Sequence, residues 1–269
     1  MNNINIIKIE PNDKSFIGFD FDPNNAPLGD LIVITSIPEN VYKTHGIKLV
    51  DIYKIWVFDY NPYILRDIVP QKILKFGDIL SKYAPERCNL KDNPYVVSMS
   101  WIYTTTFGMN LTLRHPRLYK FEENIPDGNC ICIHTTPKGT DPTRLGHIPE
   151  NVLRHIFKTY ENYKIFQVGG SSDFKINSPN LIDKTGLNFW DTAEIISKCG
   201  TFIGLNSGHT HLANCFPKTK KKVLLFNGDY LSKMIPMGAS NYGNWIDFNW
   251  GYYNNTEEDI GVTMSYLKI

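Results

Sequence analysis

The sequence has little net charge, few cysteines and no long apolar run. Its 269 residues carry 28 Lys and Arg against 27 Asp and Glu, a formal charge of +1, so the chain has no general electrostatic attraction for nucleic acid or an anionic membrane. Five cysteines, an odd number, do not suggest a disulfide framework in a chain of this size. These shortages argue against a basic nucleic-acid binder and against a disulfide-stapled secreted domain.

Membrane insertion and secretion are not expected either. No apolar stretch reaches the ~18 residues of a membrane span, and the first ten residues, MNNINIIKIE, lack the basic start and apolar core of a secretion signal. We therefore expect a cytoplasmic protein with no transmembrane segment. With 42% hydrophobic residues the chain is too apolar to be disordered, and at about 150 residues per domain one large or two small domains are expected.

The second half of the chain alternates short β-branched runs with segments of helical period, which indicates βαβ units and a parallel sheet. Strands are expected at Cys130–His134, Lys164–Val168, Leu181–Ile182, Thr201–Leu205 and Lys222–Phe226. Helices are expected at Pro149–Tyr160, from an N-cap at Asp191 to a stop at Gly200, and at His211–Phe216.

The first half is less regular. Leu31–Tyr42 has a helical pattern, but Leu31–Ile34 favours a strand and Pro38 interrupts the period, so both readings stay open. Glu122–Asn129 contains Pro and Gly and is the best candidate boundary, giving an N-terminal domain over residues 1–125 and a C-terminal domain over 126–269. Strands are expected at Ile4–Ile9, Phe16–Phe21, Ile47–Ile52, Ile55–Phe58 and Tyr95–Met99, and helices within Ile64–Tyr83 and at Glu257–Leu267.

Two loops follow predicted strands of the second half, where an open parallel sheet binds its ligands. The first, Thr135–Gly146 (TTPKGTDPTRLG), offers two hydroxyls, Lys138, Arg144 and backbone N–H groups that lead into a helix, which suits a pyrophosphate. A plain solvated surface loop is an equal alternative.

The second loop, Asn206–His211 (NSGHTH), places an amide, a hydroxyl and two imidazoles where they can reach one ligand. Two His separated by one residue can bind a metal, but no third ligand is evident nearby, so no metal site is predicted. His211 has a second reading, as a residue that caps the helix or fills a domain interface.

The stretch Leu181–Gly228 resembles the donor-domain signature of glycosyltransferase family 9, the heptosyltransferases. It has the Leu/Gly turn, the helix, the strand ending in Gly, the Ser-Gly loop, the His-Leu-Ala helix start and the last strand. Upstream, ICIHTTPKGT, HIPENVLRHIF and KIFQVGGSSD look like the family's first donor-domain strand with its phosphate loop, a helix and a Gly-Gly-x-x-Asp turn. The resemblance implies an α/β protein with two Rossmann-like domains facing a cleft, the GT-B type, with a nucleotide-sugar bound in the cleft.

The resemblance also implies which residues bind the donor. Lys138 and Arg144 are rivals for the family's phosphate-contacting Lys, and Asn206 stands where many members have an Asp that binds donor-sugar hydroxyls, which leaves the donor sugar open. The implied donor-binding residues are Thr135, Thr136, Lys138, Arg144, Gly169, Asn206, Ser207, Gly208, His209 and His211.

In the N-terminal domain the family takes a catalytic carboxylate from a Gly-Asp pair that opens the first helix. Gly29-Asp30 looks like this pair, which makes Asp30 the candidate catalytic base. Asp20 and Asp22 remain competitors, and Asp30 also suits a helix N-cap.

The implied activity is inverting, metal-independent transfer of a heptose or related sugar from a nucleoside-diphosphate sugar. ADP-heptose is the family-typical donor, no cofactor beyond this co-substrate is expected, and the acceptor would be a hydroxyl of a surface glycan or lipid-linked saccharide in lipopolysaccharide or capsule synthesis. A cytoplasmic location, with peripheral contact at the inner face of the membrane, fits that role. The alternatives are a nucleotide-sugar epimerase or hydrolase on the same fold, and a non-catalytic nucleotide-sugar or glycan-binding module.

Overall fold

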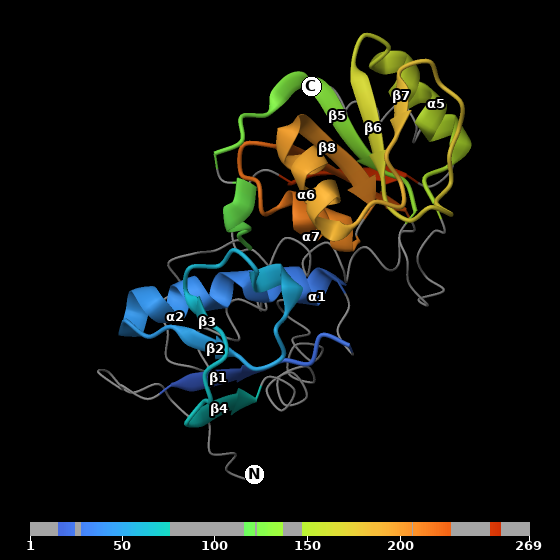
Figure 1. Cartoon of the computed structure of the whole chain (residues 1–269). Coiled ribbons are helices and arrows are strands. Elements are labelled where there is room, and N and C mark those ends of the chain that lie inside the picture. Colours follow the sequence, from blue (N-terminus) through green and yellow to red (C-terminus); the bar gives the residue numbers. More distant parts are fainter. Residues whose placement is uncertain are drawn as a thin grey trace, which may run out of the picture. The chain divides into compact units, whose positions relative to one another are not determined.

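The computed structural model describes residues 16–24, 28–75, 116–121, 123–136, 147–205, 207–226 and 248–253 (Figure 1). The described residues form two compact units, one up to Lys120 and one from Phe121 onward. The sequence-based division between residues 125 and 126 lies close to this boundary, on its C-terminal side. Each unit contains its own parallel sheet, so the α/β class predicted from the sequence is confirmed. The predicted elements Ile4–Ile9, Tyr95–Met99 and Glu257–Leu267 lie outside the described residues.

The first unit contains a four-stranded parallel sheet. Its strands are β1 (Ile17–Asp20), β2 (Leu49–Asp51), β3 (Ile64–Leu65) and β4 (Lys72–Lys75). Their order across the sheet is β3-β2-β1-β4, with every neighbouring pair parallel. This order matches the first four strands of the Rossmann arrangement, in which the chain reverses its direction of growth between the first and the fourth strand.

The segment from Leu31 to Tyr42, open between helix and strand in the sequence, is helical. It belongs to α1 (Leu28–Val33), the 3₁₀ turn η1 (Ile34–Ser36) and α2 (Ile37–His45). Pro38 lies in the first turn of α2, where its missing N–H has no helical partner to lose. Helix α2 ends at Gly46, which takes a φ of 71° and donates its N–H to the Tyr42 carbonyl over 2.7 Å.

One expectation for the first unit is wrong in the described residues. Ile55–Phe58 is no strand, because Trp56–Phe58 forms the 3₁₀ turn η2, which the Asp59 N–H closes on the Trp56 carbonyl. The range Ile64–Tyr83 begins with the strands β3 and β4, which pair with β2 and β1. Residues 76–83 lie outside the described residues, so the helix expected within this range stays a prediction.

The second unit contains a six-stranded parallel sheet. Its strands are β5 (Asp127–His134), β6 (Lys164–Val168), β7 (Leu181–Asp183), β8 (Cys199–Leu205), β9 (Lys220–Phe226) and β10 (Phe248–Tyr253). The order β10-β9-β8-β5-β6-β7 reads, from β7, as the third, second, first, fourth, fifth and sixth strands of the unit. That is the complete Rossmann order, with its topological switch point between β5 and β8. The sequence predicted every strand of this sheet except β10.

The described helices of the second unit are α5 (Glu150–Thr159), α6 (Phe189–Lys198) and α7 (Gly208–Ala213), and η3 (Tyr119–Phe121) spans the boundary between the units. Helix α5 lies where the sequence predicts it. Helix α6 is capped by Asn188, whose side chain accepts the Asp191 N–H over 3.0 Å, so Asp191 lies in the first turn and is not the N-cap. Helix α7 begins at Gly208, ahead of the predicted start at His211.

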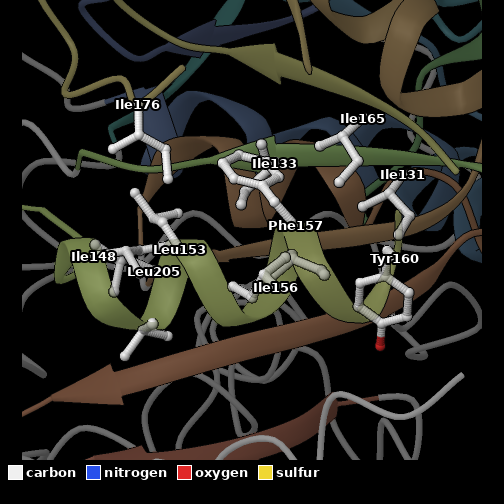
Figure 2. Packing of buried hydrophobic residues seen from close by; sticks show 12 residues of the cluster. Ile131, Ile133, Ile148, Leu153, Ile156, Phe157, Tyr160, Ile165, Ile176 and Leu205 are labelled. Atoms are coloured by element: carbon white, nitrogen blue, oxygen red, sulfur yellow. The ribbon is translucent and has the colours of Figure 1, made fainter. Parts of the chain in front are cut away.

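The core of the second unit lies between α5 and one face of the sheet (Figure 2). Alternate side chains of β5 point to opposite faces. Ile131 and Ile133 join the apolar cluster beneath α5, which puts Cys132 and His134 on the other face. The cluster consists of Ile131, Ile133, Ile148, Val152, Leu153, Ile156, Phe157, Tyr160, Ile165, Ile176, Ile203 and Leu205.

Candidate functional site

The candidate site lies at the switch point of the second sheet. Strands β5 and β8 are adjacent and parallel, with His134 paired to Gly204 near their carboxyl ends. Strand β5 ends at His134 and is followed by Thr135 and Thr136, and the chain beyond β8 leads to Ser207. In open parallel sheets, ligands bind outside the carboxyl ends of the strands at this point.

His134 lies at the centre of a buried polar cluster. Its Nδ1 lies 3.0 Å from the Oγ of Ser207, and its Nε2 lies 3.4 Å from an Oδ2 of Asp173. The His209 ring stacks on the His134 ring, with centroids 4.0 Å apart and an angle of 23° between the planes. The side chains of His134 and Asp173 are both almost fully buried. Three separate segments of the chain therefore meet around one imidazole.

Gly169, which follows β6, makes room for this cluster. Its φ of 130° is a conformation that L side chains rarely adopt. A Cβ built on Gly169 would lie 2.0 Å from the Asp173 Oδ2 and 2.9 Å from the His134 Cδ2. The same Oδ2 accepts the Gly170 N–H over 3.0 Å, which holds Asp173 in the turn after β6. Glycine is thus required at residue 169 for the carboxylate to lie beside the imidazole.

The two threonines after β5 differ in what they can offer a ligand. The Thr135 hydroxyl is fully buried, donates to the Phe174 carbonyl over 2.7 Å and accepts from the Gln167 amide over 3.0 Å. Thr136 is only partly buried, and its Oγ1 accepts the Phe174 N–H over 2.9 Å. The Thr135 hydroxyl is thus used within the protein, and Thr136 is the one whose side chain reaches the surface.

Ser207 is the N-cap residue of α7, with φ −152° and ψ 174°, but its side chain makes no hydrogen bond to the helix. The hydroxyl is directed to His134 instead. Gly208, His209 and His211 lie in α7, and each is partly exposed. Ser207, Gly208 and His209 therefore lie beside the carboxyl end of β5, as the sequence predicts for residues that share one ligand.

The structure does not describe the side chains of four predicted site residues. Lys138, Arg144 and Asn206 lie outside the described residues. The backbone of Asp30 lies in α1, which begins at Leu28, but its side chain is outside the description. Since the helix starts before Asp30, this residue lies within the first turn and the N-cap reading is wrong.

The carboxyl end of β1 carries the two rivals of Asp30. One oxygen of Asp20 accepts the Tyr53 hydroxyl over 2.8 Å, which raises the pKa of Tyr53, and one oxygen of Asp22 accepts the Asn24 N–H over 2.9 Å. Together they form an Asp-x-Asp pair, a spacing associated with divalent ions in the other large class of glycosyltransferases. Among the described residues, no group of three or more His, Cys, Asp or Glu is placed to hold a metal ion.

Sequence reasoning missed His134 and Asp173 as site residues, although both stand in motifs that it used. His134 ends the strand that leads to the first loop, and Asp173 closes the Gly-Gly-x-x-Asp turn. Their proximity depends on the order of the strands and on the conformation of Gly169. A polar residue at the last position of a buried strand was the available signal.

Comparison with known proteins bears on the fold. No protein-family model and no curated protein matches the chain. A glycosyl transferase family 9 protein of Veillonella parvula superposes with a TM-score of 0.56 at 15% identity, covering 96% of this chain and 90% of that one. The chain has the fold of glycosyltransferase family 9. Two heptosyltransferase structures agree with this result.

The ADP-heptose lipopolysaccharide heptosyltransferase II of E. coli superposes with a TM-score of 0.60 at 10% identity, covering 94% of this chain and 98% of that one. The iron-containing dodecameric heptosyltransferase TibC of enterotoxigenic E. coli, in complex with ADP-D-beta-D-heptose, superposes with a TM-score of 0.55 at 13% identity, covering 96% and 74%. The resemblance predicted from the sequence is thus confirmed for the fold. In the described part of this chain, no helix is both long and apolar enough to cross a membrane.

Proposed function

We propose that this chain is an inverting glycosyltransferase that moves a heptose or related sugar from a nucleoside-diphosphate sugar to a hydroxyl of a glycan or lipid-linked saccharide. The main support for the proposal is that Thr136, Ser207 and His209 all lie at the switch point of a complete Rossmann sheet. The fold shared with ADP-heptose transferases supports ADP-heptose as the donor.

In this proposal the diphosphate of the donor lies at the carboxyl ends of β5 and β8. Thr136 and Ser207 contribute hydroxyls there, and Lys138 and Arg144 of the loop after β5 contribute positive charge. Negative charge grows on the diphosphate as it leaves, so preorganised donors and cations at this place lower the barrier. The proposal assigns the stabilisation of the leaving diphosphate to the chain's own residues. It therefore includes transfer without a metal ion.

The reaction itself is a single displacement. The acceptor oxygen bonds to the anomeric carbon on the face opposite the diphosphate, the bond from that carbon to the diphosphate oxygen breaks, and the hydroxyl proton passes to a carboxylate. We assign the carboxylate role to Asp30, because Gly29-Asp30 resembles the family's Gly-Asp pair and lies in the first turn of α1. A general base of this kind contributes about 10²–10⁴ in rate.

A thermal-shift screen against ADP-, GDP-, UDP- and CMP-sugars tests the donor. A ligand present at about 100 times its dissociation constant stabilises the folded state by about 2.7 kcal/mol. We expect ADP-heptose to raise the melting temperature and the other nucleotide classes to raise it less. No shift with any nucleotide-sugar would contradict the proposal.

Release of nucleoside diphosphate from the same donor then tests the reaction. We expect release only with an acceptor saccharide present, unchanged by EDTA, and about 10²–10⁴-fold slower in Asp30→Asn. Turnover without acceptor would support a hydrolase or epimerase instead. Donor binding with no turnover across a wide acceptor panel would support a binding module.

A further inference from the structure

The buried chain Asp173–His134–Ser207 leads from a carboxylate to a hydroxyl at the candidate site. Asp173 lies in the turn after β6, His134 ends β5 and Ser207 precedes α7. The carboxylate lies 3.4 Å from the Nε2 of His134, and the Ser207 Oγ lies 3.0 Å from the Nδ1. The two ring nitrogens thus face two different partners. Protonation of one nitrogen therefore changes the hydrogen bonding of the partner at the other.

The contact between Ser207 and His134 can be made in two ways. When the ring carries one proton, the neighbouring carboxylate favours that proton on Nε2, so Nδ1 accepts the Ser207 hydroxyl. The hydroxyl hydrogen then points inward, and only oxygen lone pairs remain for a ligand. When both nitrogens carry protons, Nδ1–H donates to the Ser207 Oγ, and the hydroxyl hydrogen is released toward a ligand.

A diphosphate oxygen accepts hydrogen bonds and donates none, so it pairs with Ser207 in the second state. A singly protonated ring could release the hydroxyl hydrogen only by moving its proton from Nε2, beside the carboxylate, to Nδ1. We propose that His134 couples donor binding to the uptake of one proton. Before the uptake the Ser207 hydroxyl can only accept a hydrogen bond from a ligand, and after it the hydroxyl can donate one. This inference rests on the proposed function and makes His134 a positioning residue, because it acts through Ser207.

Among the described residues, the titratable groups in contact with His134 are Asp173 and His209. The Asp173 carboxylate lies on the Nε2 side of the ring, 3.4 Å away, and the His209 ring is stacked on its face at 4.0 Å. The proposal therefore places the added proton on Nδ1 of His134, where it faces the Ser207 hydroxyl.

Calorimetric titration with ADP-heptose at pH 7.5, in two buffers of different ionisation enthalpy, tests the inference. The diphosphate of this ligand is esterified at both ends, so the ligand itself titrates little near neutral pH. We expect the wild-type protein to take up a fraction of a proton, up to one per bound ligand. Affinity should fall as pH rises, approaching about tenfold per pH unit for a whole proton.

Three variants separate this mechanism from a structural effect. Ser207→Ala and His134→Asn should bind without proton uptake and with a flat pH dependence of affinity. His155→Asn, the same change at an exposed histidine of α5, should keep the wild-type uptake. Binding without uptake in the wild type, or uptake that persists in Ser207→Ala, would overturn the inference alone. No binding of ADP-heptose in either buffer would overturn the proposed function and the inference together.

Discussion

At the scale of single residues, the cluster around His134 depends on one glycine. Gly169 has a φ of 130°, and its missing side chain leaves the space that Asp173 and His134 occupy. The sequence marks Gly169 as part of a Gly-Gly turn and as a donor-binding residue. The structure adds that Gly169 shapes the cluster around His134, and direct contact with the donor stays a prediction.

Gly169→Ala is therefore expected to destabilise the protein by about 1–3 kcal/mol, because alanine is strained at this φ and its Cβ displaces Asp173. Urea denaturation measures the change. Gly128→Ala is the matched control, since a Cβ there meets nothing within 4 Å, and it should change stability by less than about 0.5 kcal/mol. Equal effects of the two substitutions would contradict this account of Gly169.

A second single residue, Glu39 on α2, holds Arg117 and Tyr119 against α2 within the first unit. It is buried and accepts hydrogen bonds from Arg117 at 3.1 and 3.2 Å and from the Tyr119 hydroxyl at 2.7 Å. Burial alone would raise the pKa of Glu39. The hydrogen bonds from Lys43 and Tyr119, with the charges of Arg117 and Lys43, outweigh burial and lower it.

Because the folded-state pKa of Glu39 lies below its ordinary value of 4.5, the ionised carboxylate stabilises the fold above that pH. The contribution is lost as the pH falls below 4.5 and through the folded-state pKa. We expect Glu39→Gln to lower the free energy of unfolding by about 1–3 kcal/mol at pH 7 and by less at pH 3.5, measured by urea denaturation at both pH values. A difference that stays constant with pH would show that the charge of Glu39 does not matter.

At the scale of elements, the sequence predicts best where the hydrophobic period is strong. Helix α5 and strands β6 and β7 lie where the pattern places them, because apolar residues recur at helical or strand spacing between clear turn residues. Trp56–Phe58 was misassigned to a strand, because such a short apolar run carries no clear period. Strand β10 was missed, since its sequence, FNWGYY, mixes aromatics with Asn and Gly.

The packing of α5 gives a prediction at this scale. Ile156 is fully buried between the helix and the sheet, and Figure 2 shows its side chain among those that α5 turns toward Ile131, Ile133 and Ile165. Ile156→Ala should cost about 2–5 kcal/mol, and Ile156→Val about 0.5–1.5 kcal/mol. Lys158→Ala, at an exposed position of the same helix, should stay within about 0.5 kcal/mol of wild type. Thermal or urea unfolding measures all three, and an Ile156→Ala loss no larger than that of Lys158→Ala would refute this packing.

At the scale of the whole molecule, the sequence predicted an α/β protein with two Rossmann-like domains, and the described residues form two units, each with a parallel sheet. The order of the strands could not be predicted from periodicity, because pairing between β5 and β8 joins segments far apart in the sequence. The same limit applies to the site. Ser207 and His209 were predicted from their motif, whereas His134 and Asp173 became visible only once the switch point was known.

The central claim is that the carboxyl ends of β5 and β8 bind the diphosphate of a nucleotide-sugar. A crystal structure of the protein with a non-reactive analogue of ADP-heptose tests this claim most directly. The account predicts the diphosphate at the switch point, with its oxygens in hydrogen-bond contact with Thr136 and Ser207. A nucleotide bound away from β5 and β8 would contradict it.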